Sequence, residues 1–248
     1  MDTHHGQHVV GSGLPGSVWL SLAAFLAITV MAALLGRRGR IGRRTSAVGV
    51  ALAVLGGAAV IRPAVLDDVM ASHIGMMPAL MTATFAAPAL FVRCLLPNGG
   101  LPRAALPAVG LLSGAVLGAV TVLWHLPAFH VRLMGGSTLS PLVLLLGGIA
   151  GAAFWLVVLD PHEATSSWRR RTVLLYGVPS GLLGLAVLLA PAPIHPELGA
   201  VWLGPMADQR VGGLLMMFAD LLLLVPVLPA AVRKVNRSAS LRPTPVRG

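Results

Sequence analysis

The sequence predicts an all-α, polytopic membrane protein: a bundle of seven transmembrane helices with its N-terminus outside and its C-terminus in the cytoplasm. Three observations lead to this prediction. Hydrophobic residues make up 56% of the 248 residues and charged residues only 10%, whereas a soluble domain is nearer 25% charged. The mean hydropathy is +0.85, and seven apolar runs reach or approach the roughly 20 residues that a helical span needs. The basic residues lie in short clusters between these runs.

The seven runs are separated by gaps that carry glycine, proline and charged residues, which end helices. The runs cover 18–36, 45–62, 69–92, 104–124, 139–159, 172–190 and 209–232. The chain therefore divides into a His-containing extracytoplasmic tail over 1–17, a transmembrane domain over 18–232 and a basic cytoplasmic tail over 233–248. No basic segment precedes the first run, which is long enough to stay as an anchor, so no cleavable signal peptide is expected.

The basic residues also orient the predicted bundle, because cytoplasmic loops of membrane proteins carry an excess of Lys and Arg. Only Arg62, Arg132 and Arg210 fall on the outer side of a seven-span arrangement. The other fifteen of the 18 basic residues fall on the inner side: Arg37, Arg38, Arg40, Arg43, Arg44, Arg93, Arg103, Arg169, Arg170, Arg171, Arg233, Lys234, Arg237, Arg242 and Arg247. Charge clustered in this way indicates topology and argues against a nucleic-acid partner. The single cysteine, Cys94, excludes an internal disulfide and a CxxC metal site.

The segment Met70–Met81 places a histidine and several thioethers in the third predicted span. Residues three or four positions apart share one helix face. One stripe is therefore formed by Met70, His73, Met77 and Met81, and Met76 flanks it. Imidazole and thioether suit copper, thioether favours Cu(I), and an ionisable group inside a bilayer is a candidate functional residue. The alternative is that the methionines fill gaps between helices and the histidine bonds to a neighbour.

Seven of the eight histidines map to the outer side of the predicted bundle: His4, His5, His8, His73, His125, His130 and His195. Only His162 maps to the inner side. Pro127 is expected to end the fourth helix, so that His125 lies near a helix terminus and can face the bundle. His130, beyond the proline, is expected at the membrane interface with headgroups or water, as a secondary candidate ligand at most.

The last predicted span begins with Asp208 and Gln209 and contains a second acidic residue, Asp220. A carboxylate at a helix start caps free amides and meets the positive end of the helix dipole, which is a structural role for Asp208 beside its candidacy as a metal ligand. Gly212 and Gly213 allow another helix to approach closely. Asp220 falls in the middle of the membrane, where a carboxylate is costly, and we expect it to be neutral or structural.

The N-terminal tail offers His4, His5 and His8 within five residues, and short His-rich tracts often bind metal. These three histidines are secondary candidate metal ligands, together with Met76 and His130. No nucleophile beside a base, P-loop or dinucleotide fingerprint is present, so we expect a protein that is not an enzyme.

Three segments together resemble the CtaG family of cytochrome c oxidase assembly factors, which are bacterial seven-span membrane proteins linked to copper supply. The third-span pattern of that family has a His, a second His four residues later and a proline-containing apolar run. The matching positions here are His73, Met77 and Pro88. A Trp-His-x-Pro pattern is matched by Trp124, His125 and Pro127.

Two further family patterns lie closer to the C-terminus. An Asp-Gln pair followed by Gly and Met is matched by Asp208, Gln209, Gly213, Met216 and Met217, and a Phe-Trp pair is similar to Phe154 and Trp155. The resemblance covers about residues 60–225. This chain departs from the family where Met77 replaces a histidine and where Leu139–Val143 lacks histidines, and fewer imidazoles with more thioether favour Cu(I) over Cu(II).

The resemblance implies a role in assembling the copper centre of an oxidase, in a bacterial plasma membrane. The expected site is an outer-side Cu(I) site of His73, Met77 and His125, with Asp208 as a ligand or as a support for one. The expected partners are a cytochrome c oxidase subunit and membrane lipid, and the oligomeric state stays open. Two alternatives remain: a copper transporter or copper-resistance protein, and a structural assembly partner that binds no metal.

Overall fold

All regular structure in the described residues is helical. The computed structural model describes residues 16–36, 42–62, 71–96, 101–133, 139–160, 166–196, 198 and 203–224. Its elements are α1 (Gly16–Gly36), α2 (Arg43–Val60), α4 (His73–Met81), the π-helix η1 (Thr82–Ala86), α5 (Ala87–Leu95), α6 (Leu106–His125), α7 (Pro127–Leu133), α8 (Leu139–Val158), α9 (Ser166–Leu189) and α10 (Pro205–Leu224). Each of the seven apolar runs therefore corresponds to helix, and α4, η1 and α5 together form the third.

Four helices are long and apolar enough to cross a membrane: His73–Leu95, Leu106–His125, Leu139–Val158 and Ser167–Leu189. Shorter apolar stretches lie at Val18–Ala32 and Arg44–Val60. Large apolar side chains such as Leu112, Leu142 and Leu182 are exposed on the outer surface of the bundle. A soluble protein rarely exposes wide apolar surface, so the helices fit a membrane-embedded protein.

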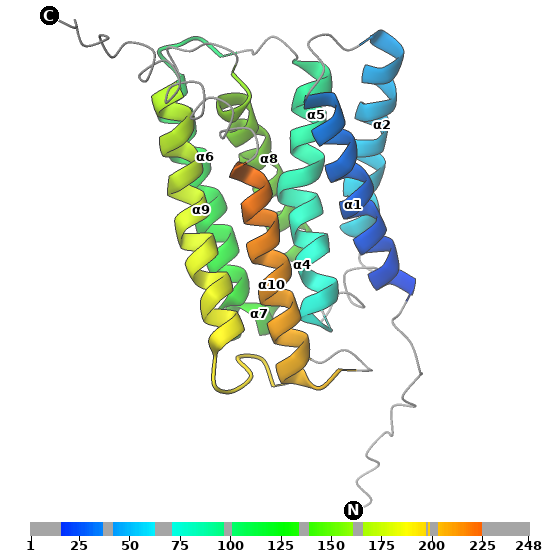
Figure 1. The fold of residues 1–248 in the computed structure, drawn as a ribbon, viewed down its shortest axis with the longest axis vertical. Helices are drawn as coiled ribbons and strands as arrows, with labels where there is room; N and C mark the ends of the chain where they lie inside the picture. The colour runs from blue at the N-terminus through cyan, green and yellow to red at the C-terminus, as the bar shows by residue number, and fades with distance from the viewer. Residues whose placement is uncertain are drawn as a thin grey trace, which may run out of the picture.

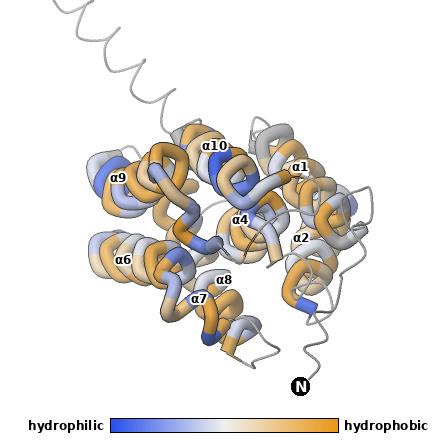
Figure 2. The backbone as a smooth tube through the Cα atoms, turned by 90° about the horizontal axis from the view of Figure 1, so that it is seen from below, coloured by the Kyte–Doolittle hydropathy of each residue, from blue (hydrophilic) through white to orange (hydrophobic). Residues whose placement is uncertain are grey.

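The segment α4–η1–α5 forms the centre of the bundle. Figure 2 shows α4 enclosed by α10, α1, α2 and α8. In the most apolar 18-residue stretch of the span His73–Leu95, 89% is buried, whereas the same measure is 33–44% in the other three long spans. The central helix therefore makes contacts on all sides, whereas the outer helices keep one face for lipid.

A π-helical turn interrupts the central segment between two prolines. Pro88 has no N–H to give to the carbonyl four residues earlier, which belongs to Thr84. The Thr84 hydroxyl bonds to the Leu80 carbonyl at 2.8 Å. Gly147 and Gly151 of α8 lie against this turn, where an added Cβ would collide with Thr84. The glycines thus let α8 pack directly on the irregular turn.

The end of α6 follows the prediction from Pro127. The helix ends at His125, Leu126 is extended, and Pro127 begins the short helix α7. The sequence did not predict α7, which is too short to give a periodic pattern. Helix α9 begins at Ser166, six residues before the predicted boundary.

Candidate metal centre

Four buried histidines gather at one end of the bundle. His73 begins α4, His125 ends α6, His130 lies in α7, and His195 lies in the loop after α9. The start of α10, the end of α9 and α7 meet at the lower end of Figure 1. None of the four side chains is more than 4% exposed. The ring centres of His73 and His195 are 5.7 Å apart, and those of His130 and His195 are 4.5 Å apart.

Asp208 joins α10 to the start of α4. Its Oδ2 accepts the backbone N–H of His73 at 2.7 Å, and its Oδ1 accepts that of Ile74 at 3.2 Å. The Ser72 side chain accepts the next amide, Gly75, at 3.0 Å. From the sequence, the Asp208 carboxylate was expected to cap the start of its own helix, α10. The carboxylate instead caps a helix 135 residues away, because the first amides of α4 have no intrahelical partners.

The same carboxylate fixes the ring of His73. Its Oδ2 lies 3.1 Å from the His73 Nδ1. A carboxylate oxygen can only accept, so Nδ1 carries a proton, and in the neutral ring the lone pair lies on Nε2. The His73 Nε2 is buried and has no hydrogen-bond partner. Metal-binding histidines are held in this way by a carboxylate or carbonyl on the second ring nitrogen.

His125 has the same arrangement with a backbone carbonyl. Its Nδ1 donates to the Thr121 carbonyl at 2.7 Å, one turn earlier in α6. The His125 Nε2 is therefore the nitrogen with the lone pair, and it too is buried without a hydrogen-bond partner. A lone pair buried in this way is costly unless a ligand satisfies it.

His130 is buried, which corrects the expectation that its ring contacts headgroups or water. Its side chain is 1% exposed, and its Nδ1 donates to the Trp124 carbonyl at 3.3 Å. The proline that ends α6 is followed at once by α7, and this short helix turns the His130 ring back under the bundle.

His195 was mapped to the outer side from the sequence but was not selected as a ligand. It lies in the segment Pro191–Pro196, and its Nε2 donates to the carbonyl of His125 at 3.2 Å. Gln209 secures this segment: its Oε1 accepts the Ile194 N–H at 2.6 Å, and its Nε2 donates to the Val187 carbonyl at 2.9 Å. The Asp-Gln pair therefore positions two histidines, one through each side chain.

Gly212 allows α10 to lie directly on the first turn of α4. A Cβ at this position would lie 2.5 Å from the His73 Cβ and 3.3 Å from its carbonyl carbon. Gly213 does the same against α9, where a Cβ would lie 2.9 Å from the Gly184 carbonyl oxygen. The predicted role of both glycines in close helix approach is confirmed.

The structure brings three of the four predicted ligands, His73, His125 and Asp208, into one region. Met76 and Met77 are buried in the hydrophobic core. His4, His5, His8 and Met70 lie outside the described residues. Within the described part of the chain, no three His, Cys, Asp or Glu side chains are arranged so that they could hold a metal ion as they stand.

Asp220 is not part of the cluster. It lies twelve residues beyond Asp208 in α10, about 18 Å along the helix axis. Both carboxylate oxygens are buried without a hydrogen-bond partner. A Cβ added to Gly181 of α9 would lie 4.0 Å from the Asp220 Oδ2, and the Ser180 side chain of the same helix is a neighbour of this carboxylate. A buried polar pair, Ser180 donating to the Tyr176 hydroxyl at 3.2 Å, belongs to the same helix α9.

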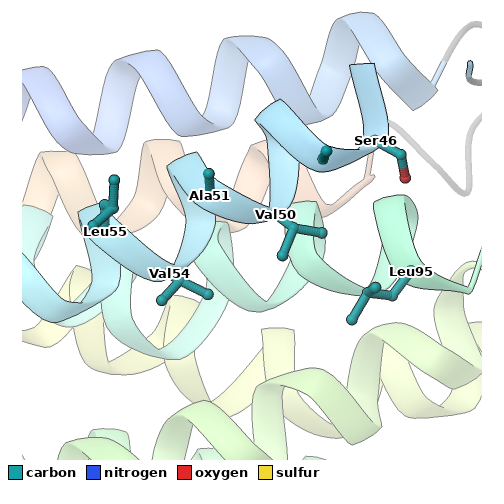
Figure 3. Close-up of a pocket in the computed structure, with 7 residues that line it drawn as sticks. Ser46, Val50, Ala51, Val54, Leu55 and Leu95 are labelled. Atoms are coloured by element: carbon teal, nitrogen blue, oxygen red, sulfur yellow. The ribbon is translucent and has the colours of Figure 1, made fainter. Parts of the chain in front are cut away.

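A shallow groove lies on the surface of the bundle between α2 and α5. It is lined by Ser46, Ala47, Val50, Ala51, Val54, Leu55 and Leu95. Figure 3 shows Val50, Val54 and Leu95 pointing to the same side. The Ser46 hydroxyl donates to the Cys94 carbonyl, so the groove presents an apolar lining. It carries no metal-ligating side chain and belongs to the surface of the bundle.

A scan against protein-family models, a search of curated proteins and a search of solved structures found no match to this chain.

Proposed function

We propose that the histidine cluster binds Cu(I) and that the protein hands this ion to an oxidase during assembly. The observation that carries the proposal is the pair of buried Nε2 atoms of His73 and His125, which have no hydrogen-bond partners. Both lone pairs are set by acceptors on the opposite ring nitrogens. A purely structural role accounts for the acceptors but leaves the two Nε2 atoms unsatisfied.

The chemistry of the donors favours copper. Imidazole nitrogen is a common ligand for copper and zinc, and low coordination by neutral nitrogen or thioether suits the soft monovalent ion. Zinc normally takes four ligands, and Asp208, the predicted fourth ligand, is already engaged by His73 and Ile74. The described side chains do not form a three-ligand site as they stand, so in this proposal the side chains adjust when the ion binds. Met77, one turn deeper in α4, stays a candidate thioether ligand.

The role in oxidase assembly comes from the resemblance to the CtaG family at His73, Trp124, His125, Pro127, Asp208 and Gln209. In this proposal the bundle crosses a bacterial plasma membrane seven times and α10 is the last span. The histidine cluster then lies at the outer side, as the distribution of arginine indicates. The tail with His4, His5 and His8 would raise the local copper concentration beside the site.

The orientation predicts how the two ends of the chain react with a membrane-impermeant thiol reagent. In a Cys94→Ser background, Gly11→Cys should be labelled in intact cells and Ser238→Cys should be labelled only after the cells are broken. Both positions lie outside the described residues, so the test depends on topology alone. Equal labelling of the two positions in intact cells would contradict the seven-span arrangement.

The assembly role predicts a copper-dependent oxidase defect in a deletion strain. Wild-type protein should restore the oxidase, whereas His73→Ala should not restore it at ordinary copper concentrations. A His73→Ala protein that restores the oxidase fully would favour the structural partner. Copper uptake into proteoliposomes that contain the wild-type protein would favour the transporter, and binding without uptake is the result expected here.

A further inference from the structure

We propose that the groove between α2 and α5 binds one acyl chain of an anionic phospholipid, whose phosphate pairs with the exposed guanidinium of Arg44. The groove lies apart from the histidine cluster, and its lipid does not depend on copper. Two features of the molecule lead to this inference: the apolar lining of the groove, and the basic charge at the end where α2 begins.

The groove suits a hydrocarbon chain in both length and lining. It follows α2 from Ser46 to Leu55, which is about 14 Å along the helix axis. The hydrocarbon core of a bilayer is about 30 Å thick, so the groove has the depth of one leaflet. Apart from Ser46, its lining consists of alanine, valine and leucine (Figure 3). An acyl chain that enters where α2 begins can therefore lie along the groove through its own leaflet.

Contacts between the helices hold the groove in shape before a lipid binds. The Ser46 hydroxyl donates to the Cys94 carbonyl, which ties the start of α2 to the end of α5. A Cβ at Gly49 would collide with the Cys94 sulfur, so the two helices pack directly against each other. The Arg93 Nη2 donates to the Leu35 carbonyl at 3.2 Å, which joins the end of α1 to α5. A preformed site loses little conformational entropy on binding.

The end of the groove at Ser46 is basic. Arg44 is exposed in the first turn of α2, and Arg93 lies in the last turn of α5. The sequence has no Asp or Glu over 3–66 or over 69–159, so α1, α2 and α5 bring positive charge and no carboxylate to this end. The positive end of the α2 dipole adds to the charge. The counter-charge that these helices lack can come from a lipid phosphate.

The place of this end in the membrane favours an anionic lipid over a neutral one. Figure 1 shows that α1 ends, α2 begins and α5 ends at the upper end of the bundle, opposite to the histidine cluster. The distribution of arginine assigns that end to the cytoplasm. The cytoplasmic leaflet carries anionic lipids, and basic pockets between transmembrane helices on that side bind their headgroups. Arginine pairs with a phosphate through two parallel hydrogen bonds.

Native mass spectrometry of the full-length protein in detergent measures lipid binding, in separate titrations with dioleoyl phosphatidylglycerol and dioleoyl phosphatidylcholine. These two lipids share their acyl chains and differ in headgroup charge. Arg44→Gln removes the proposed phosphate partner, and Arg210→Gln removes the same charge from an exposed position in α10. Ala51→Trp fills the groove, and Leu142→Trp places the same side chain on the exposed surface of α8. All four positions are exposed, so the fold should be kept, which thermal unfolding checks.

We expect the wild type to bind phosphatidylglycerol about fivefold more tightly than phosphatidylcholine, which is the effect of one basic residue near an anionic surface. Arg44→Gln should remove this preference, and Ala51→Trp should weaken the binding of both lipids. Arg210→Gln and Leu142→Trp should bind both lipids as the wild type does.

Equal affinity of the wild type for the two lipids would overturn the proposal, and so would equal losses in Arg44→Gln and Arg210→Gln. Unchanged lipid binding in Ala51→Trp would place the lipid elsewhere on the bundle. A dimer that Ala51→Trp dissociates, with lipid binding unchanged, would assign the groove to a second copy of the chain instead.

Discussion

Replacing His73 or His125 with alanine is expected to lower Cu(I) affinity at least about 100-fold in the purified protein. Each substitution removes a buried Nε2 atom that has no hydrogen-bond partner. Loss of an outer partner alone typically costs 10- to 100-fold in metal affinity, so loss of a ligand atom costs at least as much. The measurement is a competition titration in detergent against a chromophoric chelator.

The matched control for these two variants is His162→Ala. His162 lies outside the described residues and maps to the inner side of the predicted bundle, so its removal should leave the affinity unchanged. If His162→Ala lost as much affinity as His73→Ala, binding would be unspecific. If neither His73→Ala nor His125→Ala lost affinity, the copper would be bound elsewhere.

Replacing Asp208 with leucine should affect both the fold and the site. The substitution leaves the amides of His73 and Ile74 without the acceptors that they have at 2.7 and 3.2 Å. A buried donor left unsatisfied costs about 1 to 3 kcal/mol, so the expected loss in the free energy of unfolding is about 2 to 6 kcal/mol. The His73 ring also loses the group that fixes its proton on Nδ1, which should weaken Cu(I) binding.

Asp208→Asn tests the same contact more gently, because its carbonyl oxygen can still accept one amide. It should therefore be less destabilised than Asp208→Leu in thermal unfolding. Asp220→Asn, in the same helix, serves as the control, since Asp220 lies twelve residues, about 18 Å, further along the helix axis from Asp208. If Asp208→Leu unfolded at the wild-type temperature, the hydrogen bonds from the start of α4 to Asp208 in α10 would not contribute to stability as we expect.

The helices could be predicted from the sequence because each is an apolar run bounded by breakers, and all seven runs are helical in the described residues. The π-helix at Thr82–Ala86 could not be predicted, although Pro88 marks the place where a backbone bond is lost. The helix α7 was missed because seven residues give too little periodicity. The boundary at Pro127 was correct because proline acts locally.

The candidate site could be predicted only in part. Outer-side location and residue type selected His73, His125 and Asp208, and these three do lie in one region. The partner of Asp208 depends on how α10 packs on α4, which is set by tertiary contact at Gly212. His195 lies beside His73 in the structure, but the sequence did not select it as a ligand. Spacing along one helix, which favoured Met77, cannot detect a residue that a loop brings in from elsewhere.

X-ray absorption at the copper edge tests the central claim most directly, that buried imidazoles hold the ion. The sample is the full-length protein in detergent with one equivalent of Cu(I). We expect a nearest shell that includes imidazole nitrogen at about 2 Å, with the outer scattering of imidazole rings, and loss of that signal in the double variant His73→Ala/His125→Ala. A nearest shell of sulfur alone, or a spectrum unchanged in the double variant, would contradict it.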